Sequence, residues 1–215
     1  MFLTRKAQLV APEQTLPGRS ERRFELADKH VVLGTPVVTD EVPDGYEVAL
    51  FGLGCFWGAE EIYWQVPGVW STSVGYAGGT TPNPSYEEVC SGATNHTEAV
   101  RIVFDPRQVS YADLVKTFFE VHDPTQGFRQ GNDVGTQYRS AIYWTTPEQE
   151  QVARELTAVY GAELERRRLG ATTEIRPASD TPYFYAEDHH QQYLAKNPFG
   201  YRCHANTGVK FPDIS

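Results

Sequence analysis

The sequence lacks a long apolar run and is poor in cysteine, and each absence excludes a class of protein. No stretch of the 215 residues is apolar over the length that crosses a bilayer, which argues against a membrane protein. The first ten residues hold no continuous apolar segment, so we expect no secretory signal. The three cysteines, Cys55, Cys90 and Cys203, form no C-x-x-C pair, which argues against structural zinc. We expect thiols in a reducing compartment, the cytoplasm, with no metal and no cofactor.

Basic residues are also few. The 19 Lys and Arg against 28 Asp and Glu give a net charge of -9. Phosphate backbones and anionic membrane surfaces attract basic proteins, so we expect neither nucleic acid nor a membrane as a partner. The length and the 40% hydrophobic content fit one soluble globular domain, and we expect a monomer. Aromatic residues are abundant at 13%, and Tyr and Trp suit the walls of a binding site.

The pattern along the chain predicts an arm followed by a single domain. Residues 1–44 are interrupted by Pro and Gly and have a weak apolar pattern, so we expect an N-terminal arm. Strands are predicted at 47–53, 69–75, 98–104, 140–144 and 173–177, and helices at 56–65, 85–90, 110–121, 146–168 and 186–196. This alternation predicts an α/β or α+β domain with two layers, ending in an irregular tail. The long polar loop at 123–138 is the kind that often carries function.

Cys55 stands where a strand should end and a helix begin. A helix start offers unpaired N–H groups and a partial positive charge, both of which lower the pKa of a thiol. Gly54 and Gly58 leave the backbone open to a substrate. Successive helix positions point about 100° apart, so Phe56 and Trp57 should not both face the core, and one should line a concave surface beside the thiol. Alternatively, Cys55 is a small buried residue that fills the core.

Glu98 is a carboxylate in an apolar strand. Alternation places it on the same face as Val100, Ile102 and Phe104. Apolar surroundings disfavour the charged form and raise the pKa, so that Glu98 could donate a proton near neutral pH. Alternatively, Glu98 is only the solvated first residue of its strand.

Eight segments, taken in order, resemble the A-type peptide methionine sulfoxide reductases. They are GCFWG at 54–58, GYAGG at 75–79, PNP at 82–84, YEEVCSG at 86–92, HTEAV at 96–100, HDP at 122–124, QGNDVGTQYRS at 130–140 and AEDHHQQYL at 186–194. The resemblance implies an α+β fold with a two-layer, ferredoxin-like core. It also implies reduction of the S epimer of methionine sulfoxide, free or in proteins. Residues 45–215 would form the catalytic domain, including the tail.

The resemblance implies roles for the reacting groups. Cys55 would attack the sulfoxide sulfur, and Glu98 would protonate the sulfoxide oxygen. Methionine would leave, and Cys55 would remain as a sulfenic acid. Cys203 would condense with it to a disulfide, which requires the two Cα atoms to come within about 7 Å. Thioredoxin or a related dithiol protein would then reduce this disulfide. Cys90 is the other possible partner, although we expect a structural role for it.

The resemblance also implies a set of substrate-binding residues. Tyr86 and Tyr138 would hydrogen-bond the sulfoxide oxygen, and Asp133 would hold the polar side of the site. Phe56 and Trp57 would enclose the methyl group.

The sequence departs from the family pattern in its tail. Arg202 separates Cys203 from the Gly-Tyr pair that it often follows directly, and Lys210 stands where some relatives have a further cysteine. We therefore expect direct reduction of the disulfide and no relay through the tail. His189 and His190 suggest a Cys–His hydrolase, but we expect them to support the fold. A thiol peroxidase and a non-enzymatic module that binds oxidised peptides are the alternative functions.

Overall fold

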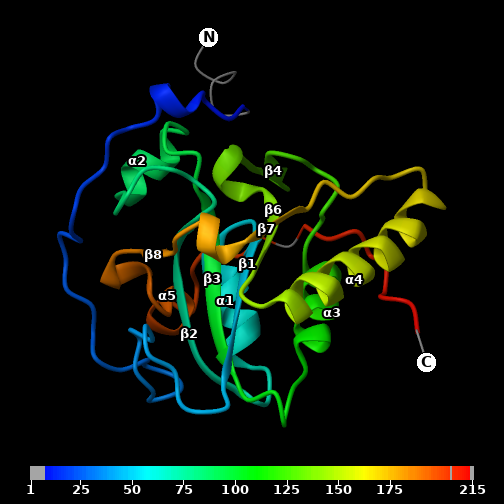
Figure 1. The fold of residues 1–215 in the computed structure, drawn as a ribbon, viewed down its shortest axis with the longest axis horizontal. Coiled ribbons are helices and arrows are strands. Elements are labelled where there is room, and N and C mark those ends of the chain that lie inside the picture. Colours follow the sequence, from blue (N-terminus) through cyan, green and yellow to red (C-terminus); the bar gives the residue numbers. More distant parts are fainter. Residues whose placement is uncertain (1–7, 204, 214–215) are drawn as a thin grey trace.

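A six-stranded sheet lies at the centre of the structure, a computed structural model that describes residues 8–203 and 205–213 (Figure 1). The strands lie in the order β7-β6-β1-β3-β2-β8, and neighbours are antiparallel except for β6 and β7. Their bounds are β1 Glu47–Leu53, β2 Val69–Ala77, β3 Thr97–Phe104, β6 Ser140–Trp144, β7 Glu174–Pro177 and β8 Phe184–Tyr185. A separate two-stranded sheet pairs β4 (Arg129–Gln130) with β5 (Asp133–Val134).

Helices cover one face of the main sheet. The long ones are α1 Phe56–Trp64, α3 Tyr111–Val121 and α4 Pro147–Glu165, and the short ones are α2 Tyr86–Cys90 and α5 Tyr193–Lys196. Side chains of α1, α3 and α4 share one buried cluster with Phe51 of β1 and Ile102 of β3. Leu50 and Ala99 are each an odd number of residues along the strand from Phe51 and Ile102, so their side chains point to the opposite face. They belong to a smaller buried cluster there. In the part of the chain described, no helix is long and apolar enough to cross a membrane.

The connections follow a ferredoxin-like order. The elements β1, α1, β2, β3, α3 and β6 follow one another along the chain, and their strands lie side by side as β6-β1-β3-β2. The prediction of a single α+β domain with two layers is therefore confirmed. Phe51 of β1 pairs with Val100 of β3 in antiparallel register. Because of this register, the end of β1 and the beginning of β3 meet, which brings the residues after Leu53 close to Glu98.

Local sequence signals account for where the helices begin. At α3, the Ser110 side chain accepts the backbone N–H of Asp113, and the Asp113 carboxylate accepts the backbone N–H of Ser110. Ser85 and Glu88 form the same reciprocal capping box at α2. Thr146 caps α4. These caps satisfy N–H groups that a helix leaves unpaired, so they fix each start within the chain.

The predicted helix at 186–196 is wrong. The segment instead forms a short 3-10 helix, Asp188–His190, and then α5, with Gln192 between them at a φ of 47°. Gln192 donates its backbone N–H and its side-chain amide to the Glu60 carboxylate, at 2.7 and 2.8 Å. Gln191 hydrogen-bonds the backbone of Val74. These long-range bonds to buried groups outweigh the local helical preference, because a buried carboxylate without partners costs several kcal/mol.

The described part of the N-terminal arm runs along the body of the molecule (Figure 1). The backbone of Val10 exchanges hydrogen bonds with the Asn95 side chain, and Arg19 forms a 2.6 Å ion pair with Glu88 of α2. Further along, His30 is buried, and its Nε2 lies 2.8 Å from Thr72 Oγ1. The arm is thus tied to the sheet and to α2 at several points.

Candidate active site

The turn between β1 and α1 places a cysteine at the helix start. Cys55 is the N-cap residue of α1, and its side chain is partly exposed. Gly54 precedes it with a φ of +97°, a backbone conformation that favours glycine. A Cβ at Gly54 would lie 2.6 Å from Cγ of Gln130, so the close approach of the 129–130 strand also requires glycine there. The thiol position is therefore set by a turn with little freedom.

Backbone N–H groups at the start of α1 face both Glu98 and Cys55. The N–H of Phe56 donates to Oε2 of Glu98 at 2.9 Å. The N–H groups of Trp57 and Gly58 lie near the sulfur of Cys55 and lower the pKa of the thiol, although the Cys55 side chain forms no capping hydrogen bond. The thiol and the carboxyl group thus both lie at the start of α1, and the Glu98 side chain, buried at the beginning of β3, lies next to the reactive turn.

The pKa of the Cys55 thiol is shifted in the direction opposite to the one expected from the sequence. Burial raises the pKa of Cys55 well above its usual range, and the charge of Glu98 raises it further. The N–H groups of Trp57 and Gly58 lower this pKa but do not outweigh burial. The prediction of a lowered pKa was wrong because it counted the helix start and not the desolvation of the sulfur.

The Glu98 carboxyl group is protonated at neutral pH. Burial raises its pKa to about 8, the hydrogen bond from Phe56 opposes this, and the charge of Asp133 raises the pKa further. This confirms the raised pKa that the sequence predicted. With Glu98 neutral, the charge that opposes ionisation of Cys55 is largely removed. Protonation of Glu98 therefore makes ionisation of Cys55 easier.

Two tyrosines lie close enough to Glu98 to sense its charge. Tyr86 is the first residue of α2, and Tyr138 is the last residue of the 3-10 helix Thr136–Tyr138. Burial raises the pKa of both phenols, and the charge of Glu98 is the next cause in each. Both hydroxyls therefore remain protonated donors throughout the physiological range. Asp133 of β5 raises the pKa of Tyr138 as well, so it belongs to the same group of side chains.

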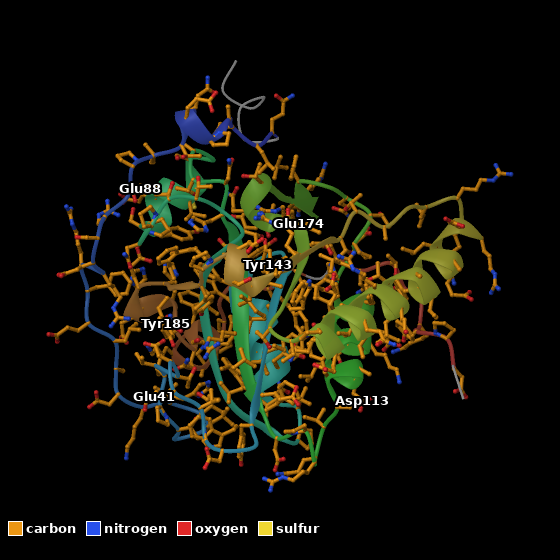
Figure 2. All side chains as sticks on the ribbon, viewed as in Figure 1. Glu41, Glu88, Asp113, Tyr143, Glu174 and Tyr185 are labelled. Carbon is orange, nitrogen blue, oxygen red and sulfur yellow. The ribbon has the colours of Figure 1, made fainter. Side chains whose placement is uncertain are left out.

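A buried ion-pair network supports the segment that carries Tyr138. The Arg139 guanidinium donates to the carbonyl of Thr136 at 2.9 Å and to the hydroxyl of Tyr143 at 3.2 Å. Tyr143 in turn donates to Glu174 at 2.9 Å, and the labels of both residues lie near the centre of Figure 2. Because Arg139 follows Tyr138 directly, this network fixes the backbone of the tyrosine.

Phe56 and Trp57 occupy different environments, as their helix spacing predicted. Phe56 is buried, and its ring lies 5.9 Å from that of Tyr76. Trp57 is partly exposed and stacks on Tyr193, with ring centroids 3.9 Å apart. The indole N–H of Trp57 donates to Nδ1 of His190 at 3.1 Å, which fixes the orientation of the ring.

The tail brings the second cysteine to the same region. The Cys203 thiol lies 3.5 Å from the carbonyl oxygen of Gln130, and its sulfur would lie 3.3 Å from a Cβ at Gly131. Gln130 also packs against Gly54, the residue before Cys55. One residue of β4 therefore contacts both the reactive turn and the tail. No disulfide joins Cys55 and Cys203 in the structure.

Comparison with known proteins identifies the family. A family model described as peptide methionine sulfoxide reductase matches residues 47–214. The chain belongs to the peptide methionine sulfoxide reductase family. It is therefore an oxidoreductase that reduces methionine sulfoxide through a thiol, as the sequence resemblance implied.

Relatives support the A type. The reductase is 57% identical to the peptide methionine sulfoxide reductase MsrA of Salinispora arenicola, over 99% of this chain and 96% of that protein. The methionine sulfoxide reductase A structure of Corynebacterium diphtheriae matches with a TM-score of 0.85 and 50% identity, over 96% of this chain and all of that one. Mxr1 of Saccharomyces cerevisiae in its reduced form matches with a TM-score of 0.70 and 31% identity, over 76% and 92%. Mxr1 has also been solved in complex with Trx2.

Cys90 lies nearer the site of the reductase than its predicted structural role suggested. It is the last residue of α2, and its side chain hydrogen-bonds the hydroxyl of Tyr86. Its charge also raises the pKa of Tyr76 and Tyr138. The position of Cys90 at a helix end did not predict its closeness to these tyrosines, because that closeness arises from the packing of α2 on β2.

Three residues support the site, and the sequence predicted a role only for His190, which was expected to support the fold. The Glu187 carboxylate accepts the hydroxyl of Tyr76 and the backbone N–H of Tyr86, both at 2.8 Å. His190 orients Trp57, and Gln130 links the two cysteine segments. All three lie inside the segments that carried the family resemblance, which was the available signal. Within residues 8–203 and 205–213, no group of three or more His, Cys, Asp and Glu is placed to hold a metal ion.

Proposed function

We propose that Cys55 and Glu98 act together as nucleophile and acid in the reductase. The Cys55 thiolate attacks the sulfoxide sulfur while Glu98 gives its proton to the sulfoxide oxygen. The sulfur–oxygen bond of the substrate breaks, the oxygen ends on Cys55 as a sulfenic acid, and methionine leaves. The sulfoxide gains two electrons, and the Cys55 sulfur loses two, so the step is balanced.

One contact carries this proposal. The N–H of Phe56, the residue directly after Cys55, donates to Glu98 at 2.9 Å, which keeps the acid beside the nucleophile. Burial raises the pKa of Glu98 to about 8, so the acid holds its proton at neutral pH. Removing the Glu98 charge in turn favours ionisation of Cys55, and the N–H groups of Trp57 and Gly58 stabilise the thiolate.

The surroundings support binding of one sulfoxide epimer. Tyr86 and Tyr138 would donate hydrogen bonds to the sulfoxide oxygen, and Asp133 would keep that side of the site polar. Phe56 and Trp57 would enclose the methyl group on an aromatic side. A polar side and an apolar side distinguish the oxygen from the methyl group, which supports selection of the S epimer.

Cys203 is the proposed partner in resolving the sulfenic acid. Its contact with Gln130, which also packs on Gly54, supports a short path to Cys55. A thioredoxin-type dithiol protein would reduce the resulting disulfide, and the complex of the yeast relative Mxr1 with Trx2 supports this class of reductant. All reacting groups would lie in residues 45–215, and residues 1–44 would form an arm. With only three cysteines and no C-x-x-C pair in the sequence, we place the enzyme in the cytoplasm.

An epimer-resolved assay with thioredoxin tests the proposal. We expect the wild type to reduce the S epimer and not the R epimer, and Cys55→Ser to lose all reduction while its circular dichroism is unchanged. Methionine formation by Cys55→Ser at the wild-type rate would refute the role of Cys55 as the nucleophile. The same assay with hydrogen peroxide tests the thiol peroxidase alternative, for which peroxide would be reduced faster than the sulfoxide.

A further inference from the structure

A charge pair ties the tail to the helix that begins at Cys55. The Arg202 guanidinium donates through Nε to Oε2 of Glu61 and through Nη2 to Oε1, both at 2.7 Å. The two side chains are 30% and 24% exposed, so solvent screens the pair less than it screens a fully exposed one. Isolated surface ion pairs contribute little, but a bidentate guanidinium–carboxylate pair has the fixed geometry that can hold a segment in place.

The same guanidinium also braces its own segment. Nη1 of Arg202 donates to the carbonyl oxygens of Pro198 and Gly200, at 2.8 and 3.3 Å. Arg202 therefore joins the turn at 198–200 to α1 with donors on all three nitrogens. The hydrogen bonds on either side of Arg202 are longer, at 3.2 Å from Tyr201 to Asp133 and 3.5 Å from Cys203 to Gln130.

This pair, the Arg202–Glu61 clamp, links the residue before Cys203 to the helix that begins at Cys55. Arg202 directly precedes Cys203, and Glu61 lies six residues after Cys55. Six residues of α-helix span about 9 Å along the axis, and α1 is a rigid element packed on the sheet. A tail held at Glu61 is therefore held at a set distance from the thiol at the start of the same helix.

We propose that the Arg202–Glu61 pair is a positioning device that holds Cys203 ready to close the disulfide. This inference rests on the proposed role of Cys203. In that step the Cys203 sulfur attacks the sulfenic sulfur of Cys55, the sulfur–oxygen bond breaks, and the hydroxyl leaves as water with the proton of the Cys203 thiol. Cys203 is oxidised and Cys55 is reduced as the disulfide forms. Restricting the tail raises the effective concentration of Cys203 at Cys55 without a direct contact to the reacting atoms.

Single-turnover experiments separate this role from methionine formation. The reduced enzyme is mixed with methionine sulfoxide and quenched over time. Methionine, sulfenic acid trapped with dimedone, and disulfide are then measured by mass spectrometry. For Arg202→Ala and Glu61→Ala we expect methionine to form at the wild-type rate and the disulfide to form about tenfold more slowly, a difference of about 1.4 kcal/mol. The sulfenic acid should accumulate in both variants.

A charge swap and a matched control sharpen the test. Combining Arg202→Glu with Glu61→Arg should restore most of the disulfide rate, because the pair is rebuilt in reverse. Arg154→Ala removes the ion pair to Glu150 on the surface of α4 and should leave both rates unchanged. Wild-type disulfide rates in both alanine variants would overturn the clamp. So would an equal loss of methionine formation, since the pair would then act through α1.

Cys203→Ser distinguishes failure of the clamp from failure of the proposed function. If the disulfide still forms with this variant, the resolving role belongs to another cysteine, and the clamp inference fails with it. If Cys203→Ser forms no disulfide but Arg202→Ala forms it at the wild-type rate, only the clamp is overturned.

Discussion

The two segments that carry Cys55 and Cys203 are built in opposite ways. The backbone fixes the start of α1 through a glycine that packs on Gln130 and through the Phe56 N–H group, which donates to Glu98. The tail around Cys203 has neither helix nor strand in its described residues and is held by side-chain hydrogen bonds. A nucleophile needs fixed geometry, because small misplacement costs rate, whereas a resolving thiol must move to meet its partner.

Burial shows the same contrast. Glu98 is buried, so the site holds a titratable group whose pKa is shifted to about 8. Such a group is costly to bury, and the surrounding fold must supply the stability that offsets it. Cys203, Arg202 and Glu61 are partly exposed, and breaking their contacts exposes little apolar surface. Local opening of the tail should therefore cost far less than opening of the helix start.

Among substitutions in the tail, Cys203→Ser should have the largest effect. We expect one methionine per enzyme molecule and no sustained turnover with thioredoxin, because the sulfenic acid on Cys55 finds no second thiol. The measurement is methionine released per enzyme over time. Cys90→Ser is the matched control and should keep cycling. The assignment would be reversed by sustained turnover in Cys203→Ser together with its loss in Cys90→Ser.

Glu98→Gln tests the rigid segment at the start of α1, next to which Glu98 lies. The amide keeps an oxygen to accept the N–H of Phe56 but cannot donate a proton as an acid. Loss of general acid catalysis typically slows a reaction by about 10²–10⁴-fold, so we expect kcat for methionine formation to fall within that range with little change in KM. Rapid-quench kinetics of the first turnover measure it. An unchanged rate would remove the acid role from Glu98.

The same variant should change how stability depends on pH. The pKa of Glu98 rises from 4.5 to about 8 on folding, so between these values the folded state binds more protons than the unfolded state. The stability of the folded state is therefore unaffected by Glu98 ionisation below pH 4.5, and it falls as pH rises from 4.5 towards 8. Relative to the wild type, Glu98→Gln should gain Tm as pH rises through this window. Parallel curves of Tm against pH would contradict the raised pKa.

Regular periodicity and local caps made much of the fold predictable. The strands predicted at 47–53 and 98–104 correspond to β1 and β3, and the helix predicted at 110–121 corresponds to α3. The break at Gln192 was not predictable, because its cause is a hydrogen bond to Glu60, far away in the sequence. Within the site, the sign of the Cys55 pKa shift failed for a similar reason. Burial depends on which segments pack over the sulfur, and a single sequence does not state that.

Gly54→Ala tests whether the rigid turn is required. The alanine would take a φ of +97° and place its Cβ 2.6 Å from Gln130, so strain and a clash act together. We expect a loss of about 1–3 kcal/mol in the free energy of unfolding, measured by urea denaturation, and slower methionine formation. Gly161→Ala is the control, since Gly161 lies inside α4 with open space around it and alanine favours the helix. Equal stability of the two variants would mean that the turn can relax.

Tyr201→Phe tests the tail at its smallest contact. The exposed Tyr201 donates to Asp133 at 3.2 Å, and one such hydrogen bond contributes about 0.5–1.5 kcal/mol net. We expect disulfide formation to slow a few-fold, less than in Arg202→Ala, with Tm and the first-turnover rate unchanged. Stopped-flow and thermal melts measure these. A larger effect than that of Arg202→Ala would make Tyr201 the main attachment of the tail. A slower first turnover would instead tie the tail to the chemistry at Cys55 through Asp133, and the two segments would no longer be separable.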